Sequence, residues 1–396
     1  MPKALLAIFF TLAIDAIGMG LIMPILPALI RDAGHLAATG WQYGALLSLY
    51  AAMQFLFAPL LGSLSDRFGR RPLLLISVFG AAVDYVFMAF APNLVLLFAG
   101  RAISGITGAN MSVASAYITD ITPEEARAKR FGQMSALFGI GFMIGPILGG
   151  FLGDIWVRAP FLAAAALNAV NLLMIFVVVP ETSVPSTEIK ALPKLSLLGP
   201  IKPLKTFRAL WGLIFVTLIF ALVGEAAGTI WVPFVEDQFH WSGHMIGLSL
   251  TCFGVFHAAT QGFLVGPVSK WLGPRGGLLL AMACDGAAYM WMAFNGQGWL
   301  VFAVMPLFAL GGTGGPILQS LLSERVDGDN QGALMGLVTS LHSFVSIFAP
   351  LSISLIYFGS RNSFPGLIWV LAATLYLVCL PFLRKATRSA PQLATP

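Results

Sequence analysis

The chain has 396 residues, of which 58% are hydrophobic and 10% are charged, and its formal net charge is +5. A soluble domain carries about 25% charged residues. This composition therefore excludes a soluble globular domain and a disordered chain, and it requires a surface that is largely covered by lipid.

Apolar runs long enough to cross a bilayer recur along the whole chain, because each crossing needs about 20 apolar residues. The first run carries Asp15 and is too long for a cleavable signal peptide. We expect about twelve spans. They fall at 4–29, 41–63, 72–91, 95–118, 131–153, 159–180, 209–235, 244–268, 275–295, 299–322, 331–358 and 364–383.

The longest polar interruption is rich in Pro and Lys and divides the spans into two equal sets. We therefore predict an all-α integral membrane protein made of two six-helix bundles. The expected parts are an N-terminal bundle over 1–180, a cytoplasmic linker over 181–208, and a C-terminal bundle with a short cytoplasmic tail over 209–396.

Basic residues indicate the orientation, since they are enriched on the cytoplasmic side of membrane proteins. Nearly all of those outside the spans fall on the side that holds the N-terminus, and the opposite side holds only Arg31, Arg158 and Arg361. We expect both termini to be cytoplasmic. The positive charge then reflects topology, and we expect no binding of nucleic acid.

The two halves are related in sequence. A shift of 204 positions places Gly62–Arg71 on Gly266–Arg275 and Pro146 on Pro350. A parallel repeat of two helical bundles is typical of one large class of secondary transporters, whose substrate site lies between the repeats.

Several charged side chains fall within the spans, where charge is costly and usually functional. By helical rise, Asp15, Asp84 and Asp285 lie near mid-membrane, and Arg101 needs an acidic or polar partner. Carboxyl groups in a low-dielectric cavity can bind and release protons near neutral pH, and a substrate cation can compete with the proton. That competition is the physical basis of proton-coupled exchange. Each acid could instead be part of a buried structural ion pair.

Other polar side chains also lie at membrane depth. His257 and Gln261 share one helix face, Glu225 is deep but nearer the outside, and His342 is central in its span. The histidines could be ordinary core residues, and Glu225 could face a watery vestibule without a role.

A short segment between the second and third spans combines glycines with charges. Gly62 and Gly69 allow a tight link, and Asp66 can pair with nearby arginines to hold adjacent helices together. The alternative is that the arginines only follow the positive-inside rule. The predicted conformational latch consists of Gly62, Asp66, Arg67, Arg70 and Arg71.

The fifth span carries glycines four residues apart. They form a flat face for close helix packing, and a proline among them bends the helix. Ordinary enrichment of Gly and Pro in membrane helices is the alternative. The predicted packing motif consists of Gly141, Gly145, Pro146, Gly149 and Gly150.

These motifs resemble those of a known family. Gly62–Arg71 resembles the loop signature of the major facilitator superfamily, and Gly141–Gly150 resembles the helix 5 motif of its drug/proton antiporters. Further segments are similar to the tetracycline efflux proteins of Gram-negative bacteria. They are Leu12–Pro24, Leu49–Gln54, Gly100–Gly108 and Gln331–Leu334.

The resemblance implies export of a metal–tetracycline chelate in exchange for protons across the bacterial inner membrane. It implies a small-molecule drug as substrate, no cofactor besides the proton gradient, no metal bound by the protein itself, and a monomer in the lipid bilayer. In that family, acids in helices 1, 3 and 9 and the arginine in helix 4 act in coupled transport. The matching residues are Asp15, Asp84, Asp285 and Arg101 for coupling, and Gln54, His257 and Gln261 for polar positions.

The sequence departs from the family in places that bear on the substrate. Glu225 stands where the family usually has a neutral glutamine, and Asn110-Met111 replaces a small Thr-Gly pair. Gly311–Gly315 and His342 are also unfamiliar. We therefore include Glu225 and Asn110 among the candidate substrate-binding residues.

Other functions remain open at the level of sequence. A broader multidrug/proton antiporter is the main alternative, and a proton-coupled importer is disfavoured by the helix 5 motif. A membrane receptor that transports nothing is a third alternative. We expect no enzyme, because the sequence has no His-Glu-x-x-His, no Gly-x-Ser-x-Gly and no Gly-Lys phosphate loop.

Overall fold

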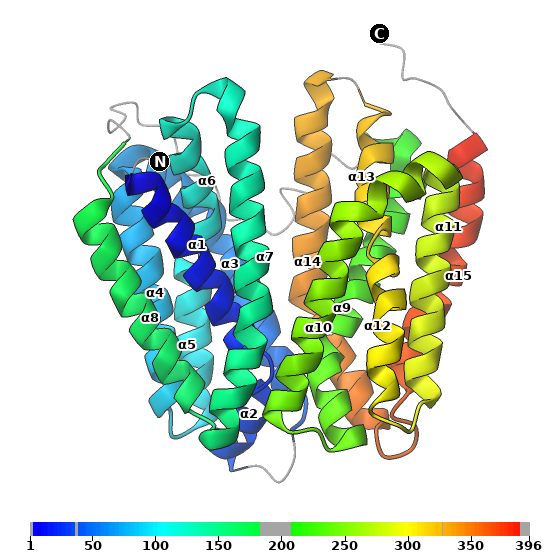
Figure 1. The fold of residues 1–396 in the computed structure, drawn as a ribbon, viewed down its shortest axis with the longest axis horizontal. Helices are drawn as coiled ribbons and strands as arrows, with labels where there is room; N and C mark the ends of the chain where they lie inside the picture. The colour runs from blue at the N-terminus through cyan, green and yellow to red at the C-terminus, as the bar shows by residue number, and fades with distance from the viewer. Residues whose placement is uncertain (1–2, 36–38, 183–206, 327, 389–396) are drawn as a thin grey trace. The chain divides into compact units, whose positions relative to one another are not determined.

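The computed structural model describes residues 3–35, 39–182, 207–326 and 328–388, and within these ranges it contains helices and no strands (Figure 1). Residues 183–206, most of the linker expected over 181–208, lie outside the described residues. In chain order the helices are α1 (Lys3–Ile22), α2 (Leu26–Gly34), α3 (Gln42–Phe68), α4 (Arg70–Phe90), α5 (Leu94–Thr107), α6 (Asn110–Ile121), α7 (Glu124–Ile155), α8 (Ala159–Val178), the 3-10 helix η2 (Arg208–Leu210), α9 (Trp211–Phe239), α10 (Gly243–Phe263), α11 (Val265–Phe294), α12 (Leu300–Gly311), α13 (Gly314–Ser323), α14 (Gly328–Ser360) and α15 (Leu367–Arg388).

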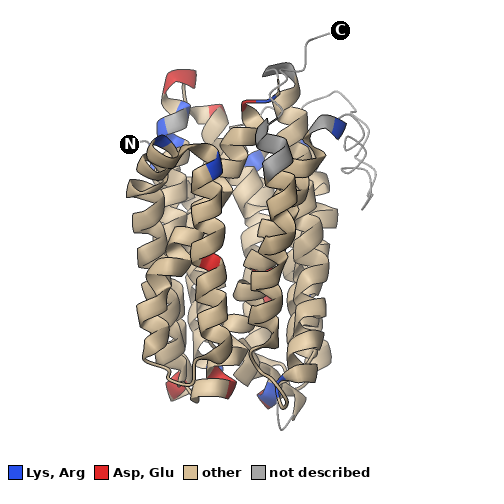
Figure 2. Ribbon diagram, turned by 90° about the vertical axis from the view of Figure 1, so that its right-hand side faces the viewer, with Lys and Arg blue, Asp and Glu red and all other residues tan. Residues whose placement is uncertain are grey.

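The helices have the length and apolar composition of membrane spans. Ten segments of the described chain are long and apolar enough to cross a bilayer. One of them, Gly243–Phe294, contains both α10 and α11, and the shorter apolar helix Leu367–Leu383 follows the last. Charged residues lie mostly near the helix ends (Figure 2). The segments match the expected spans and confirm the prediction of an all-α integral membrane fold.

The chain folds into two compact units. The first comprises Met1–Leu195 with Trp241–Thr251, and the second comprises Ser196–His240 with Cys252–Pro396. The start of α10 thus groups with the first unit.

Contacts with α7 hold the start of α10 against the first unit. Asp154 of α7 accepts hydrogen bonds from the backbone nitrogens of Gly243 at 2.8 Å and His244 at 3.0 Å. A carboxylate at a helix N-terminus satisfies backbone N–H groups that have no partner within the helix. Gly150 approaches the backbone of Gly243 so closely that a side chain would not fit there.

The core of the first unit lies between α1, α4, α6 and α8. Ile8, Val78, Tyr117 and Ile175, one from each helix, are fully buried. In the second unit, Trp369 of α15 is fully buried among aromatic rings of neighbouring helices. These cores set the positions of the polar side chains described below.

Glycines of α7 allow it to pack on the backbone of α1. A Cβ atom on Gly141 would lie 2.6 Å from the carbonyl oxygen of Ala13, and one on Gly145 would lie 2.5 Å from that of Ile17. Gly149 approaches the backbone of α1 in the same way, and Pro146 lies inside α7. The structure thus places the predicted packing motif in a close helix–helix contact.

The internal repeat is visible in the backbone. Gly69, with φ of 104°, precedes α4, and Gly273, with φ of 64°, lies at the kink inside α11. The two positions are related by the same shift of 204 that aligns the halves. Gly108 and Gly312, also related by this shift, lie at the breaks after α5 and α12. The repeat predicted from sequence is therefore also a structural one.

Several expected spans are interrupted rather than continuous. The first is broken between α1 and α2, where Pro24 and Pro27 lack the N–H that a continuous helix needs. The fourth is broken at Gly108, and the tenth at Gly312. At the fourth, turn hydrogen bonds from Gly108 N to Gly105 O and from Ala109 N to Thr107 O replace the helical ones. Non-helical backbone at membrane depth is tolerated where it is buried in protein or lines a water-filled cavity.

Candidate functional site

Asp84 and Arg101 form a buried ion pair in the first unit. Asp84 lies in α4 and has no exposed surface, and Arg101 lies in α5 and is 8% exposed. The guanidinium donates from Nε to Asp84 Oδ1 at 3.2 Å, and its Nη2 pairs with Oδ2. The neighbouring Gly100 makes room for this contact, because a Cβ there would lie 2.9 Å from Asp84 Oδ1. The partner that Arg101 needs is therefore Asp84.

The ion pair is connected to α3 through an aromatic ring. The guanidinium carbon of Arg101 lies 5.2 Å from the ring centroid of Tyr50. The side chain of Gln54 donates to the Tyr50 hydroxyl at 3.4 Å and to the backbone oxygen of Gly108 at 3.3 Å. Through Tyr50, Gln54 thus links Arg101 to the break between α5 and α6.

Asp15 of α1 has a neutral partner on the other side of this break. Asn110, the first residue of α6, donates from Nδ2 to Asp15 Oδ1 at 3.0 Å. Asn110 is only 6% exposed, and Asp15 is half-buried. The break between α5 and α6 therefore carries two polar contacts, one with Gln54 and one with Asp15.

Asp285 of α11 is buried in the second unit and contacts a hydroxyl group. Tyr376 of α15 donates to Asp285 Oδ2 at 2.6 Å. Gly311 of α12 lies directly against the carboxyl group, so that a side chain there would clash with it. Within the described residues, the contacts of Asp285 are with tyrosine hydroxyls and not with a basic side chain.

Gln261 and His257 of α10 meet the break between α12 and α13. Gln261 donates from Nε2 to the backbone oxygen of Gly312 at 2.9 Å and lies 3.4 Å from His257 Nε2. A Cβ on Gly312 would lie 2.6 Å from His257 Cε1. Each unit therefore has a glutamine whose amide donates to a carbonyl at a helix break, namely Gln54 to Gly108 and Gln261 to Gly312.

Glu225 joins α9 to α14. Its Oε1 accepts a hydrogen bond from the hydroxyl of Ser346. His342 lies one helical turn before Ser346 on α14 and is exposed. The structure thus gives Glu225 a neutral partner.

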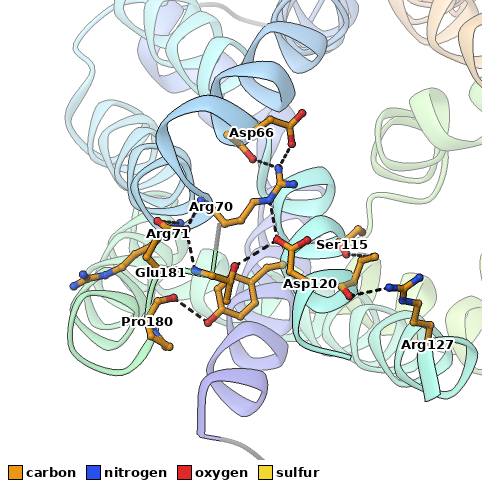
Figure 3. A network of polar contacts seen from close by, with 12 residues as sticks. Asp66, Arg70, Arg71, Ser115, Asp120, Arg127, Pro180 and Glu181 are labelled. Atoms are coloured by element: carbon orange, nitrogen blue, oxygen red, sulfur yellow. Dashed lines mark hydrogen bonds and ion pairs between the residues drawn. The ribbon is translucent and has the colours of Figure 1, made fainter. Parts of the chain in front are cut away.

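Arg70 is the centre of a polar network at the start of α4 (Figure 3). Its guanidinium lies 2.5 Å from Asp66 of α3 and 3.1 Å from Asp120 of α6, and it donates to the Ser65 hydroxyl at 2.6 Å. Glu181, just after α8, accepts a hydrogen bond of 2.8 Å from the backbone nitrogen of Arg70. Arg70 and these three carboxylates therefore connect α3, α4, α6 and the end of α8.

The other members of the predicted latch have different positions. Arg71 extends away from Asp66 (Figure 3). Its guanidinium donates to the backbone oxygen of Phe176 in α8. The guanidinium of Arg67 lies 5.2 Å from the ring of the adjacent Phe68. The expectation that Gly62 belongs to a tight link is wrong, because α3 continues as a helix to Phe68.

Sequence reasoning did not identify Tyr50, Tyr376, Ser346 and Glu181 as site residues. A tyrosine or serine within an apolar helix has no signal that separates it from a core residue. Glu181 had one usable signal, since an acid that follows a span can satisfy the N-terminus of a neighbouring helix. Within the described part of the chain, no three His, Cys, Asp or Glu side chains lie together as a metal site.

Comparisons with known proteins cover nearly the whole chain. The model of the Major Facilitator Superfamily matches residues 8–238 and 213–396. The tetracycline resistance protein of class C from Escherichia coli is 47% identical over 98% of this chain and 98% of its own length. The class G protein from Vibrio anguillarum is 45% identical over 94% of this chain and 95% of its own length.

A solved structure agrees with this assignment at the level of the fold. The nucleoside transporter NupG is 12% identical, with a TM-score of 0.78 over 98% of this chain and 100% of that one. The resemblance inferred from the sequence motifs is therefore confirmed. The chain is a multi-pass membrane protein that belongs to the major facilitator superfamily and, within it, to the tetracycline resistance proteins of Gram-negative bacteria.

Proposed function

We propose that this chain exports tetracycline, as a chelate with a divalent cation, across the bacterial inner membrane in exchange for protons. Relatives named as tetracycline resistance proteins of classes C and G align over at least 94% of the chain, so both units are included in the likeness. The similarity to these relatives supports tetracycline as the substrate, and the buried carboxyl groups support the coupling of its transport to protons.

The observation that carries the proposal is the environment of Asp285. The residue is 9% exposed and lies within a membrane-spanning helix, and its carboxyl group contacts a tyrosine hydroxyl. A charged carboxylate in such a place is costly unless it is paired or neutralised. Binding a proton or a substrate cation neutralises it, and the two cannot be bound at once. Mutual exclusion at one group, combined with alternating access of that group to the two sides of the membrane, produces exchange.

The first unit contributes the remaining coupling residues. The Asp84–Arg101 pair supplies a second carboxylate that can change partner when the state of the site changes. Asp15 is held by Asn110, a neutral amide that can accompany either charge state of the carboxyl group. We assign proton coupling to Asp15, Asp84, Asp285 and Arg101, and substrate binding to Gln54, Asn110, Glu225, His257 and Gln261.

The proposal includes the setting of the protein. Both termini are cytoplasmic, as the distribution of basic residues predicts. The chain acts as a monomer, without a resident cofactor or metal and without enzymatic chemistry, and the divalent cation belongs to the substrate. The latch around Arg70 acts in the conformational cycle and not in substrate binding.

A drug-susceptibility panel of cells that express the chain tests this function. Expression should raise resistance to tetracycline, and Asp285→Asn should abolish that resistance at an equal amount of protein in the membrane. Glu124→Gln is the matched control, because Glu124 is an exposed carboxylate at the start of α7. Unchanged tetracycline susceptibility with the wild-type chain would exclude the proposed substrate.

A broader multidrug/proton antiporter is the second candidate. The observation that favours it is Glu225, a carboxylate on α9 whose partner is the neutral Ser346. A carboxylate of this kind can attract organic cations that carry no chelated metal. Resistance to cationic dyes in the same panel would support this candidate.

A further inference from the structure

An apolar groove runs between α4 and α8 on the first unit. It has a volume of about 470 Å³. Both helices are candidate membrane spans, and the rims of the groove are exposed, with Phe79 58% and Phe176 61% accessible. The groove therefore opens toward the lipid phase. Its lining residues are Leu75, Ile76, Phe79, Ala169, Leu172, Leu173 and Phe176.

A positive charge lies at one end of this groove. The Arg71 guanidinium donates from Nη2 to the backbone oxygen of Phe176 at 2.5 Å, and its carbon lies 5.4 Å from the Phe176 ring centroid. The contact holds the charge against a residue that lines the groove. Glu181 accepts hydrogen bonds from the backbone nitrogens of Arg70 and Arg71.

The depth of the groove fits one leaflet of a bilayer. Arg71 lies in the first turn of α4, so Leu75 and Phe79 lie roughly 6 and 12 Å deeper along the helix. Half of the hydrocarbon core of a bilayer is about 15 Å thick. The charge is thus at the level of lipid headgroups, and the apolar lining covers the depth of the acyl chains below it.

We propose that this groove is a binding site for one anionic phospholipid. The lipid phosphate pairs with the Arg71 guanidinium, and one acyl chain lies along the groove between α4 and α8. A zwitterionic lipid can make the same apolar contacts, but its own cationic group lies near Arg71 and weakens the pairing. Assignment to the cytoplasmic leaflet rests on the proposed orientation, whereas the site itself does not depend on the transported substrate.

Native mass spectrometry of the full chain tests the site without substrate or gradient. The protein is equilibrated with equal amounts of a phosphatidylglycerol and a phosphatidylethanolamine with identical acyl chains, and the bound lipids are counted. The wild type should retain one phosphatidylglycerol. Arg71→Gln should lower the ratio of phosphatidylglycerol to phosphatidylethanolamine about fivefold, the effect of one basic residue near a membrane surface. Arg71→Lys keeps the charge and should retain most of the preference.

Two further variants complete the test. Ala169→Trp fills the groove from an exposed position of α8 and should lower the binding of both lipids. Arg275→Gln is the matched control, because Arg275 occupies the position of Arg71 in the second repeat and is exposed. An unchanged lipid ratio in Arg71→Gln, or an equal loss in Arg275→Gln, would overturn the proposal. Either result leaves the tetracycline proposal untouched, because no transport is measured.

Discussion

Tyr376 donates a hydrogen bond of 2.6 Å to Asp285, and this contact joins α15 to the buried carboxyl group whose environment carries the proposed function. Removing the hydroxyl leaves the carboxyl group without this donor. We predict that Tyr376→Phe weakens proton-coupled efflux, because a hydrogen bond to a charged group is worth about 1.5–3 kcal/mol. The measurement is tetracycline uptake into inverted membrane vesicles under an imposed proton gradient.

Tyr357→Phe is the matched control for that variant. Tyr357 is also a fully buried tyrosine, and its hydroxyl donates to Asp237 at 3.0 Å near the end of α9. It should leave uptake nearly unchanged. If both tyrosine variants reduced uptake equally, the effect would report on folding of the second unit, and the specific role of Tyr376 would be wrong.

The Asp84–Arg101 pair allows structural and coupling roles to be separated. Removing one partner of a buried pair costs about 3–5 kcal/mol, whereas removing both is much milder. We predict that Asp84→Asn and Arg101→Gln each lower thermal stability in detergent and that the double variant recovers most of it. Transport should remain absent in the double variant. Recovery of transport together with stability would make this pair purely structural.

Glu225 should determine the charge preference of the substrate. We predict that Glu225→Gln lowers resistance to a monovalent cationic dye by about fivefold, since a partly exposed charge pair is worth up to about 1 kcal/mol and a factor of ten requires about 1.4 kcal/mol. Tetracycline resistance should change little. Ser346→Ala keeps the charge and removes its hydrogen-bond partner, and it should spare dye resistance. Equal changes in both resistances would leave Glu225 without a role in selectivity.

The network around Arg70 should act on the transport cycle. Asp66 is largely exposed, and Arg70 keeps contacts with Asp120 and Ser65 when Asp66 is removed, so Asp66→Ala should cost at most about 1 kcal/mol of stability. We predict that the variant lowers the rate of transport and leaves equilibrium tetracycline binding intact. Binding by fluorescence and uptake by vesicles measure the two quantities. A loss of binding with normal cycling would contradict the latch.

The sequence predicted the helical spans, the repeat and the need of Arg101 for a polar partner, because apolar length and intramembrane charge are local properties. It did not predict which side chains meet. Tyr376 lies 91 positions from Asp285, and Glu181 lies 111 positions from Arg70. Such contacts depend on how helices pack, which composition does not encode. The break at Gly108 was also missed, since glycine is common in membrane helices and rarely marks an interruption by itself.

Proton movement driven by tetracycline in proteoliposomes tests the central claim most directly. The purified chain is reconstituted with a pH indicator inside, and tetracycline with Mg²⁺ is added on one side without an initial pH gradient. The wild type should move protons in the direction opposite to the drug, and Asp285→Asn should move none while Glu124→Gln behaves as the wild type. Tetracycline flux without proton movement in the wild type, or undiminished proton movement in Asp285→Asn, would contradict the account.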